Sequence, residues 1–142
     1  MVYFDTSFIA PLFLSEPDSE RIENLVRSLR SGSLAVSHWT HVEFASLLGR
    51  RARMKELTER QAAQVLTLFE QLIVDSYHVI LPTVGDFDLA VHLLENRRTG
   101  LRAGDALHLA IAQNHRAEQF YTLDAGLLKA AATYGISASA GK

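Results

Sequence analysis

The sequence contains no cysteine. This excludes disulfide-stabilised folds and thiolate metal sites, and it suits the reducing cytosol, so we expect a cytoplasmic protein. Long apolar runs are also missing, and no run could cross a bilayer, so no membrane partner is expected. The apolar segment from Phe8 to Leu14 has no basic leader and no small-residue cleavage site after it, which predicts mature structure rather than a signal peptide.

A strong excess of charge of either sign is missing as well. The 142 residues include 14 Lys and Arg against 16 Asp and Glu, a formal net charge of −2, so the chain is not the basic body typical of nucleic-acid binders. An acidic site would lower this sum without removing local basic patches, so nucleic acid is not excluded. Because 48% of the residues are apolar and 21% are charged, we expect one globular domain.

What the chain does contain is an alternation of short apolar segments with helical patterns. Strands are expected at about 1–5, 34–37, 78–82 and 119–124, with a short edge strand at 136–138. Helical spacing covers 7–13, 17–30, 39–54, 58–73, 86–98, 104–112 and 125–134. This alternation predicts an α/β fold, a three-layer α/β/α sandwich with a mainly parallel sheet of four to five strands.

The first strand, Val2 to Phe4, is followed directly by Asp5. A short apolar strand at the start of a chain usually lies in the middle of a sheet. An aspartate at the carboxyl end of such a strand lies where open α/β sheets place their ligands. Asp124 ends the fourth predicted strand in the same way.

Two further acids stand in awkward positions: Glu43 in an apolar helix after the second strand, and Asp105 at the start of a helix that is apolar nearly all round. Taken singly, each of the four acids has an ordinary explanation as a cap, a turn former or a salt-bridged helix residue. Crowded carboxylates repel and lose hydration. Because Mg²⁺ and Mn²⁺ prefer oxygen ligands and offset that cost, the four together predict a divalent-metal site suited to phosphoryl chemistry.

Four motifs carry a resemblance to a known family. They are Tyr3-Phe4-Asp5-Thr6-Ser7, Ser37 through Val42-Glu43-Phe44-Ala45, Leu101-Arg102-Ala103-Gly104-Asp105-Ala106-Leu107-His108-Leu109-Ala110 and Tyr121-Thr122-Leu123-Asp124. In this order and at this length the chain resembles the PIN-domain ribonucleases, in particular the VapC-type toxins of type II toxin–antitoxin systems. The resemblance spans nearly the whole chain and implies a single PIN domain over residues 1–142.

The resemblance implies a Mg²⁺- or Mn²⁺-dependent endoribonuclease that hydrolyses RNA and leaves a 5′-phosphate and a 3′-hydroxyl. It implies a set of catalytic and metal-binding acids: Asp5, Glu43, Asp105 and Asp124. Thr6 or Ser7 would hold the Asp5 carboxylate, and Thr122 would do similar work beside Asp124. One departure is Leu127-Leu128, which stands where some relatives carry a further acid.

Partners are also implied by the resemblance. Family members are commonly homodimers, and a cognate antitoxin blocks them with a C-terminal segment that lies over helices near the site. As a hypothesis, RNA phosphates flanking the cut contact one or both basic clusters. These are Arg97, Arg98 and Arg102 before Asp105, and Arg50, Arg51, Arg53 and Lys55 at the end of the Glu43 helix. Charged helix ends that favour the dipole explain both clusters equally well.

Other polar and aromatic residues have simpler interpretations. The six histidines form no metal set, so zinc is not expected. His108 is predicted to be a hydrogen-bonded core residue, and Trp39 to be packing. Two other functions remain open: a strand-end-aspartate phosphatase, although a second aspartate two residues after Asp5 is missing, and a catalytically silent PIN-like binding module, although four acids are retained.

Overall fold

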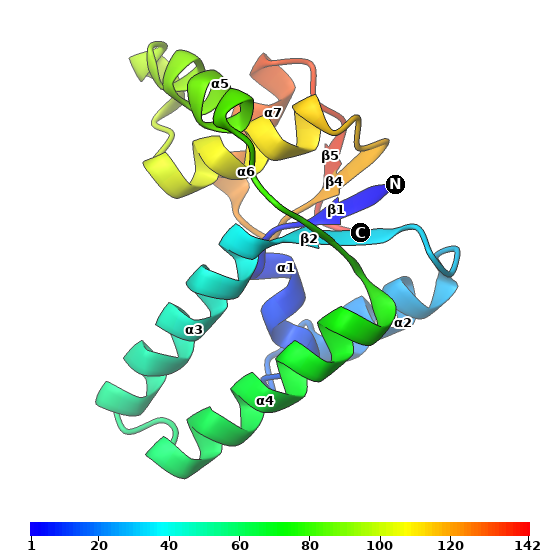
Figure 1. Cartoon of the computed structure of the whole chain (residues 1–142), viewed down its shortest axis with the longest axis vertical. Coiled ribbons are helices and arrows are strands. Elements are labelled where there is room, and N and C mark those ends of the chain that lie inside the picture. The colour runs from blue at the N-terminus through cyan, green and yellow to red at the C-terminus, as the bar shows by residue number, and fades with distance from the viewer.

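The computed structural model describes all residues from 1 to 142 (Figure 1). The strands are β1 (Val2–Phe4), β2 (Leu34–Ser37), β3 (His78–Ile80), β4 (Gln119–Tyr121) and β5 (Ala138–Ser139). The helices are α1 (Thr6–Ile9), α2 (Ser19–Ser28), α3 (His38–Arg53), α4 (Glu59–Ser76), α5 (Val84–Leu94), α6 (Ala103–Asn114) and α7 (Ala125–Thr133), with 3-10 turns η1 (Ala10–Leu12) and η2 (Arg97–Thr99). The predicted order of strands and helices is confirmed, but the last strand begins two residues later than expected.

The five strands form one sheet in the order β3-β2-β1-β4-β5, and every pair is parallel. The predicted central place of β1 is therefore confirmed. The chain leaves β1 on the side of β2 and later returns to its other side through β4, so a crevice forms at the carboxyl ends of these strands. Asp5 follows β1 at this crevice, and its N–H donates to the carbonyl of Tyr121 at 3.1 Å.

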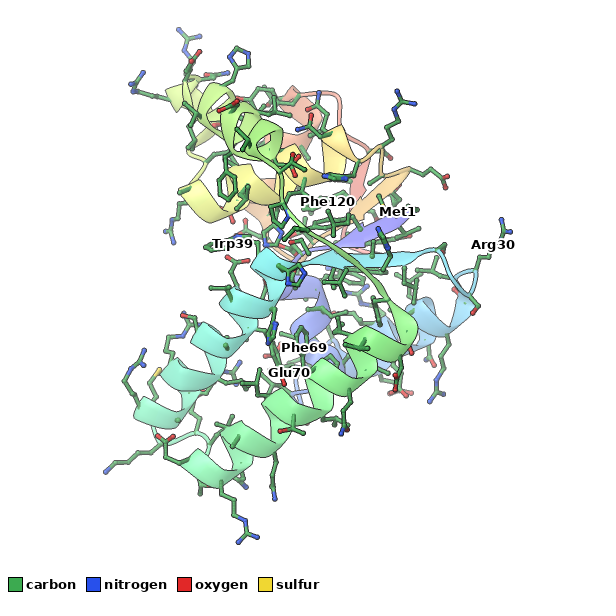
Figure 2. All side chains as sticks on the ribbon, in the orientation of Figure 1. Met1, Arg30, Trp39, Phe69, Glu70 and Phe120 are labelled. Carbon is green, nitrogen blue, oxygen red and sulfur yellow. The ribbon has the colours of Figure 1, made fainter.

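Two hydrophobic cores lie on opposite faces of the sheet, because successive side chains of a strand point in opposite directions. Tyr3 and Phe120 pack with residues of α5, α6 and α7. Phe4 packs on the other face, where α1 to α4 lie and where Phe69 is found between α3 and α4 (Figure 2). None of the helices combines the length and hydropathy needed to span a bilayer.

The start of α5 differs from the sequence prediction, which put it at Asp86. The helix begins at Val84 because Thr83 caps it: the Thr83 hydroxyl accepts the Asp86 N–H at 3.3 Å, and the Asp86 carboxylate accepts the Thr83 N–H at 2.9 Å. Asp86 is fully buried, and it also bonds Asn114 at 2.8 Å and His115 at 3.0 Å. Burial raises the pKa of Asp86, but these donors outweigh it and hold the pKa below its usual range.

We expect D86N to lower the free energy of unfolding at pH 7 by about 1–3 kcal/mol. The amide NH₂ would replace one carboxylate oxygen and face groups that donate hydrogen bonds to Asp86, so buried donors would lose their acceptor. The pKa of Asp86 is lower in the folded protein than in the unfolded chain. Its carboxylate therefore stabilises the fold at pH values above the unfolded pKa, and this stabilisation is lost as the pH falls through the folded pKa. Urea unfolding at pH 7 and pH 3 measures both effects. Asp88 is exposed on the same helix, so D88N is the matched control; an equal loss in the two variants would contradict the prediction.

Candidate active site at the carboxyl edge of the sheet

Two neighbouring cavities, of about 710 and 510 Å³, lie at the carboxyl edge of the sheet. They share Trp39, Glu43 and Asp124 in their walls. The second cavity is also lined by Asp105. The structure therefore brings three of the four predicted acids to one cavity. Asp5 lines neither cavity and is only 4% exposed.

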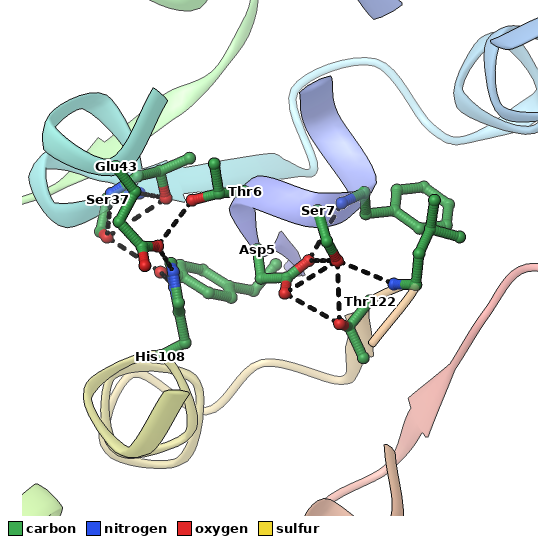
Figure 3. A network of polar contacts seen from close by, with 11 residues as sticks. Asp5, Thr6, Ser7, Ser37, Glu43, His108 and Thr122 are labelled. Carbon is green, nitrogen blue, oxygen red and sulfur yellow. Dashed lines mark hydrogen bonds and ion pairs between the residues drawn. The ribbon is translucent and has the colours of Figure 1, made fainter. Parts of the chain in front are cut away.

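Asp5 is held in place by three donors from two segments of the chain (Figure 3). Ser7 Oγ donates to its Oδ1 at 2.8 Å, Thr122 Oγ1 donates to its Oδ2 at 2.8 Å, and the Phe8 N–H donates to Oδ1 at 3.1 Å, capping α1. Burial raises the pKa of Asp5 to about 6, although the positive charge of His108 and these donors lower it. Of the two predicted alternatives, Ser7 contacts Asp5 and Thr6 does not.

Thr122 also differs from the prediction. Its hydroxyl donates to Asp5 rather than to the side chain of Asp124, and it accepts the backbone N–H of Asp124 at 3.1 Å. Thr122 is fully buried and directly follows β4. It therefore links Asp5 to the segment that carries Asp124.

Glu43 is fixed through one of its two oxygens. Thr6 Oγ1 donates to Oε1 at 2.7 Å, and His108 Nε2 bonds the same oxygen (Figure 3). Burial raises the pKa of Glu43, but the hydrogen bond and charge of His108, together with the Thr6 hydroxyl, outweigh burial and lower it. Glu43 is therefore an anion with a fixed orientation at the wall shared by the two cavities.

Asp105 lies in the first turn of α6, and Asp124 is the N-cap residue of α7. Asp105 is the third residue of α6, and its pKa is raised by burial and by the negative charges of Asp124 and Glu43. This repulsion is what a cation between the carboxylates would relieve. Asp124 caps α7 by accepting the Leu127 N–H on Oδ1 at 2.9 Å, so a capping role and a place in the cavity coexist.

His108 is buried and hydrogen-bonded, as predicted, but its contact with Glu43 was missed. Its Nδ1 lies 2.8 Å from the Tyr3 hydroxyl, which lies 2.9 Å from Ser37 Oγ. Because a carboxylate only accepts, Nε2 of His108 donates to Glu43. The signal was in the sequence, since His108 stands three residues after Asp105 and so shares its helix face.

Three residues of the basic clusters line the cavities. Arg102 lines the second cavity, whereas Arg97 and Arg98 are exposed on η2 and line neither. Arg50 and Arg51 line the first. Trp39 packs against the core that includes residues of α5 and α6, as predicted. It also lines both cavities, and its indole N–H is buried with no hydrogen-bond partner.

The donor set has the chemistry of a Mg²⁺ or Mn²⁺ site, since it consists of carboxylates around an open cavity. As the side chains stand, however, no three histidine, aspartate or glutamate side chains form a group that could hold a metal ion. Mg²⁺ commonly takes only one or two protein carboxylates and keeps several waters. The residues therefore fit a largely hydrated ion rather than a closed protein cage.

Known proteins share this arrangement of strands and helices. A family model described as PIN domain matches residues 2–133. The solved structure of FitAcB from Neisseria gonorrhoeae is 18% identical over 99% of this chain and 98% of that chain, with a TM-score of 0.79. VapC20 from Mycobacterium tuberculosis, described as a sarcin–ricin loop cleaving toxin, is 20% identical over 92% and 95%, with a TM-score of 0.73. No curated protein matches the sequence.

The raised pKa of Asp5 predicts how the metal-free protein responds to pH. Ionisation of Asp5 costs stability as the pH rises through about 6, whereas asparagine never ionises. We therefore expect D5N to exceed the unmodified protein in free energy of unfolding by about 1–3 kcal/mol at pH 7.5, and to match it near pH 4. The Ser7 and Thr122 hydroxyls can reverse to accept from the amide.

Thermal and urea unfolding in the presence of a chelator measures this difference at both pH values. Asp18 is partly exposed directly before α2 and pairs with Arg21, so D18N controls for loss of one paired negative charge. A D5N variant that is less stable than the unmodified protein at pH 7.5 would contradict the prediction.

Proposed function

The chain belongs to the PIN-domain family, and on that premise we propose that it is a Mg²⁺- or Mn²⁺-dependent endoribonuclease that acts as the toxin of a toxin–antitoxin pair. One observation carries the proposal: Glu43, Asp105 and Asp124 line a single cavity at the crevice of a parallel sheet, and Asp5 is buried at the end of the central strand. The raised pKa of Asp105 supports a cation between these groups, because its causes include the charges of the two neighbours.

Glu43, Asp105 and Asp124 would hold the divalent ion, directly or through water, with Asp5 buried at the end of the central strand. When bound, the ion would activate an attacking water and neutralise charge on the scissile phosphate. Ser7 and Thr122 orient Asp5, and Thr6 and His108 orient Glu43. With a pKa of about 6, Asp5 is mostly ionised at neutral pH and adds negative charge to the site.

An antitoxin and a second copy of the chain are the proposed protein partners. Several apolar side chains of α3 and α4 are exposed, among them Val42, Leu68 and Leu72. Val42 also lines the first cavity, next to Glu43. An antitoxin segment that covers Val42 would lie beside Glu43 and reach the acids with a basic side chain. The exposed apolar residues of α5, Val84, Phe87 and Val91, are available to a homodimer.

No observation favours the other two functions. Ser7 stands two residues after Asp5, where a strand-end-aspartate phosphatase carries its acid/base, and it is occupied in bonding Asp5. A silent module would not need three carboxylates around one cavity. We therefore retain the nuclease as the proposed function.

The direct test is cleavage of a mixed RNA by purified, antitoxin-free protein. We expect cleavage with Mg²⁺ or Mn²⁺, none with a chelator, and a loss of about 100-fold or more in D5A, because Asp5 contributes charge and position to the site. D88N, on the exposed face of α5, should cleave as the unmodified protein does. Protein that binds no divalent metal and cuts no RNA would rule the nuclease out.

A second test concerns the cluster of Arg97, Arg98 and Arg102. Replacing all three with alanine should weaken RNA binding in chelator and reduce the slope of log K against log salt by about 0.7 for each phosphate that the variant no longer neutralises. A filter-binding series in salt measures this slope. The matched control replaces three exposed arginines elsewhere, Arg27, Arg30 and Arg60. Unchanged binding in the first variant would remove this cluster from the RNA-binding surface.

A further inference from the structure

Gly104 occupies a position in α6 that its backbone does not require to be glycine. It is the second residue of the helix, directly before Asp105, and its φ is not in the left-handed region. Glycine is among the least favourable residues in a helix. The reason for glycine here therefore lies in its surroundings rather than in its backbone conformation.

The surroundings of Gly104 are tight for a side chain. A Cβ at this position would lie 3.0 Å from Oε2 of Glu43, and 3.3 and 3.4 Å from Cζ2 and Nε1 of Trp39. A contact of this length is tighter than nine in ten real Cβ contacts, so Glu43 or Trp39 would have to give by a few tenths of an ångström. Both residues line the two cavities together with Asp124.

A shift of Glu43 would be opposed by its other contacts. Its Oε1 is bonded by Thr6 from α1 and by His108 from α6, and His108 is fixed in turn by Tyr3 of the central strand (Figure 3). These bonds hold the carboxylate from one side. Its other oxygen, Oε2, faces the space that the missing side chain of Gly104 leaves open.

We infer that Gly104 is a positioning residue for Glu43, because the space it leaves lets Oε2 stay in the cavity that also receives Asp105 and Asp124, where a divalent cation can reach it. This inference rests on the proposed function. Gly104 has no functional group of its own. It would join the predicted acids as a residue of the site only because its missing side chain leaves space for Glu43. In this arrangement Thr6 and His108 fix one oxygen of Glu43 while Gly104 keeps the other free.

The test compares G104A with G49A. Gly49 lies inside α3, where an added Cβ would meet only Arg53 Nη1 at 3.4 Å, an ordinary contact. We expect G104A to weaken Mn²⁺ binding by about tenfold or more and RNA cleavage by about ten- to a hundredfold, since small displacements of catalytic groups are costly. Any fall in its melting temperature should be small, because the better helix propensity of alanine offsets part of the strain at Glu43. G49A should match the unmodified protein in Mn²⁺ affinity and cleavage.

Titration calorimetry with Mn²⁺ and thermal unfolding without metal supply readouts that do not depend on cleavage. A double-mutant cycle then identifies Glu43 as the affected group. The shorter side chain in E43D withdraws the carboxylate from position 104, so G104A should change Mn²⁺ affinity less in the E43D background than in the unmodified one.

The outcomes separate the proposed function from the role of Gly104. If the unmodified protein neither binds Mn²⁺ nor cleaves RNA, the proposed function fails, and this inference fails with it. If the unmodified protein does both and G104A behaves as G49A does, only the role of Gly104 is overturned. A lower melting temperature in G104A with unchanged Mn²⁺ affinity also overturns it, because packing against Trp39 would then be the reason for glycine.

Discussion

The burial of a carboxylate at the end of the central strand is the constraint on which the rest of the site depends. Removing Asp5 from water is costly unless donors replace its hydration. Ser7, Thr122 and the Phe8 N–H supply those donors, and they come from the first and fourth strand connections. The need to satisfy one charge therefore fixes how β1, α1 and the segment after β4 meet.

The central strand β1 also positions Glu43, through the face of the sheet opposite to the one that carries Phe4. Because side chains alternate along a strand, Tyr3 points towards α6, away from the face that carries Phe4. There its hydroxyl lies 2.8 Å from His108, and His108 in turn bonds Glu43. Packing and site geometry thus share the same buried residues, so the orientation of Glu43 depends on the core.

Local patterns in the sequence were sufficient for most of the fold. Hydrophobic spacing predicted the order of helices and strands, and the apolar segment before Asp5 indicated a central strand, which the sheet order confirms. The prediction for α5 was wrong at its start because Thr83 and Asp86 form a capping box two residues earlier than expected. Such boundary errors arise because a cap depends on a few side-chain bonds rather than on periodicity.

The sequence by itself determined which residues are candidates for the site, because carboxylates at the end of a buried strand or on an apolar helix lose hydration, which is costly without compensation. It could not determine their partners. Thr122 bonds Asp5 across 117 positions and His108 bonds Glu43 across 65, and such distant pairs are decided by how the strands and helices pack. The space beside Gly104 is likewise a tertiary property, since it exists only where α3 and α6 approach each other at the carboxyl edge of the sheet.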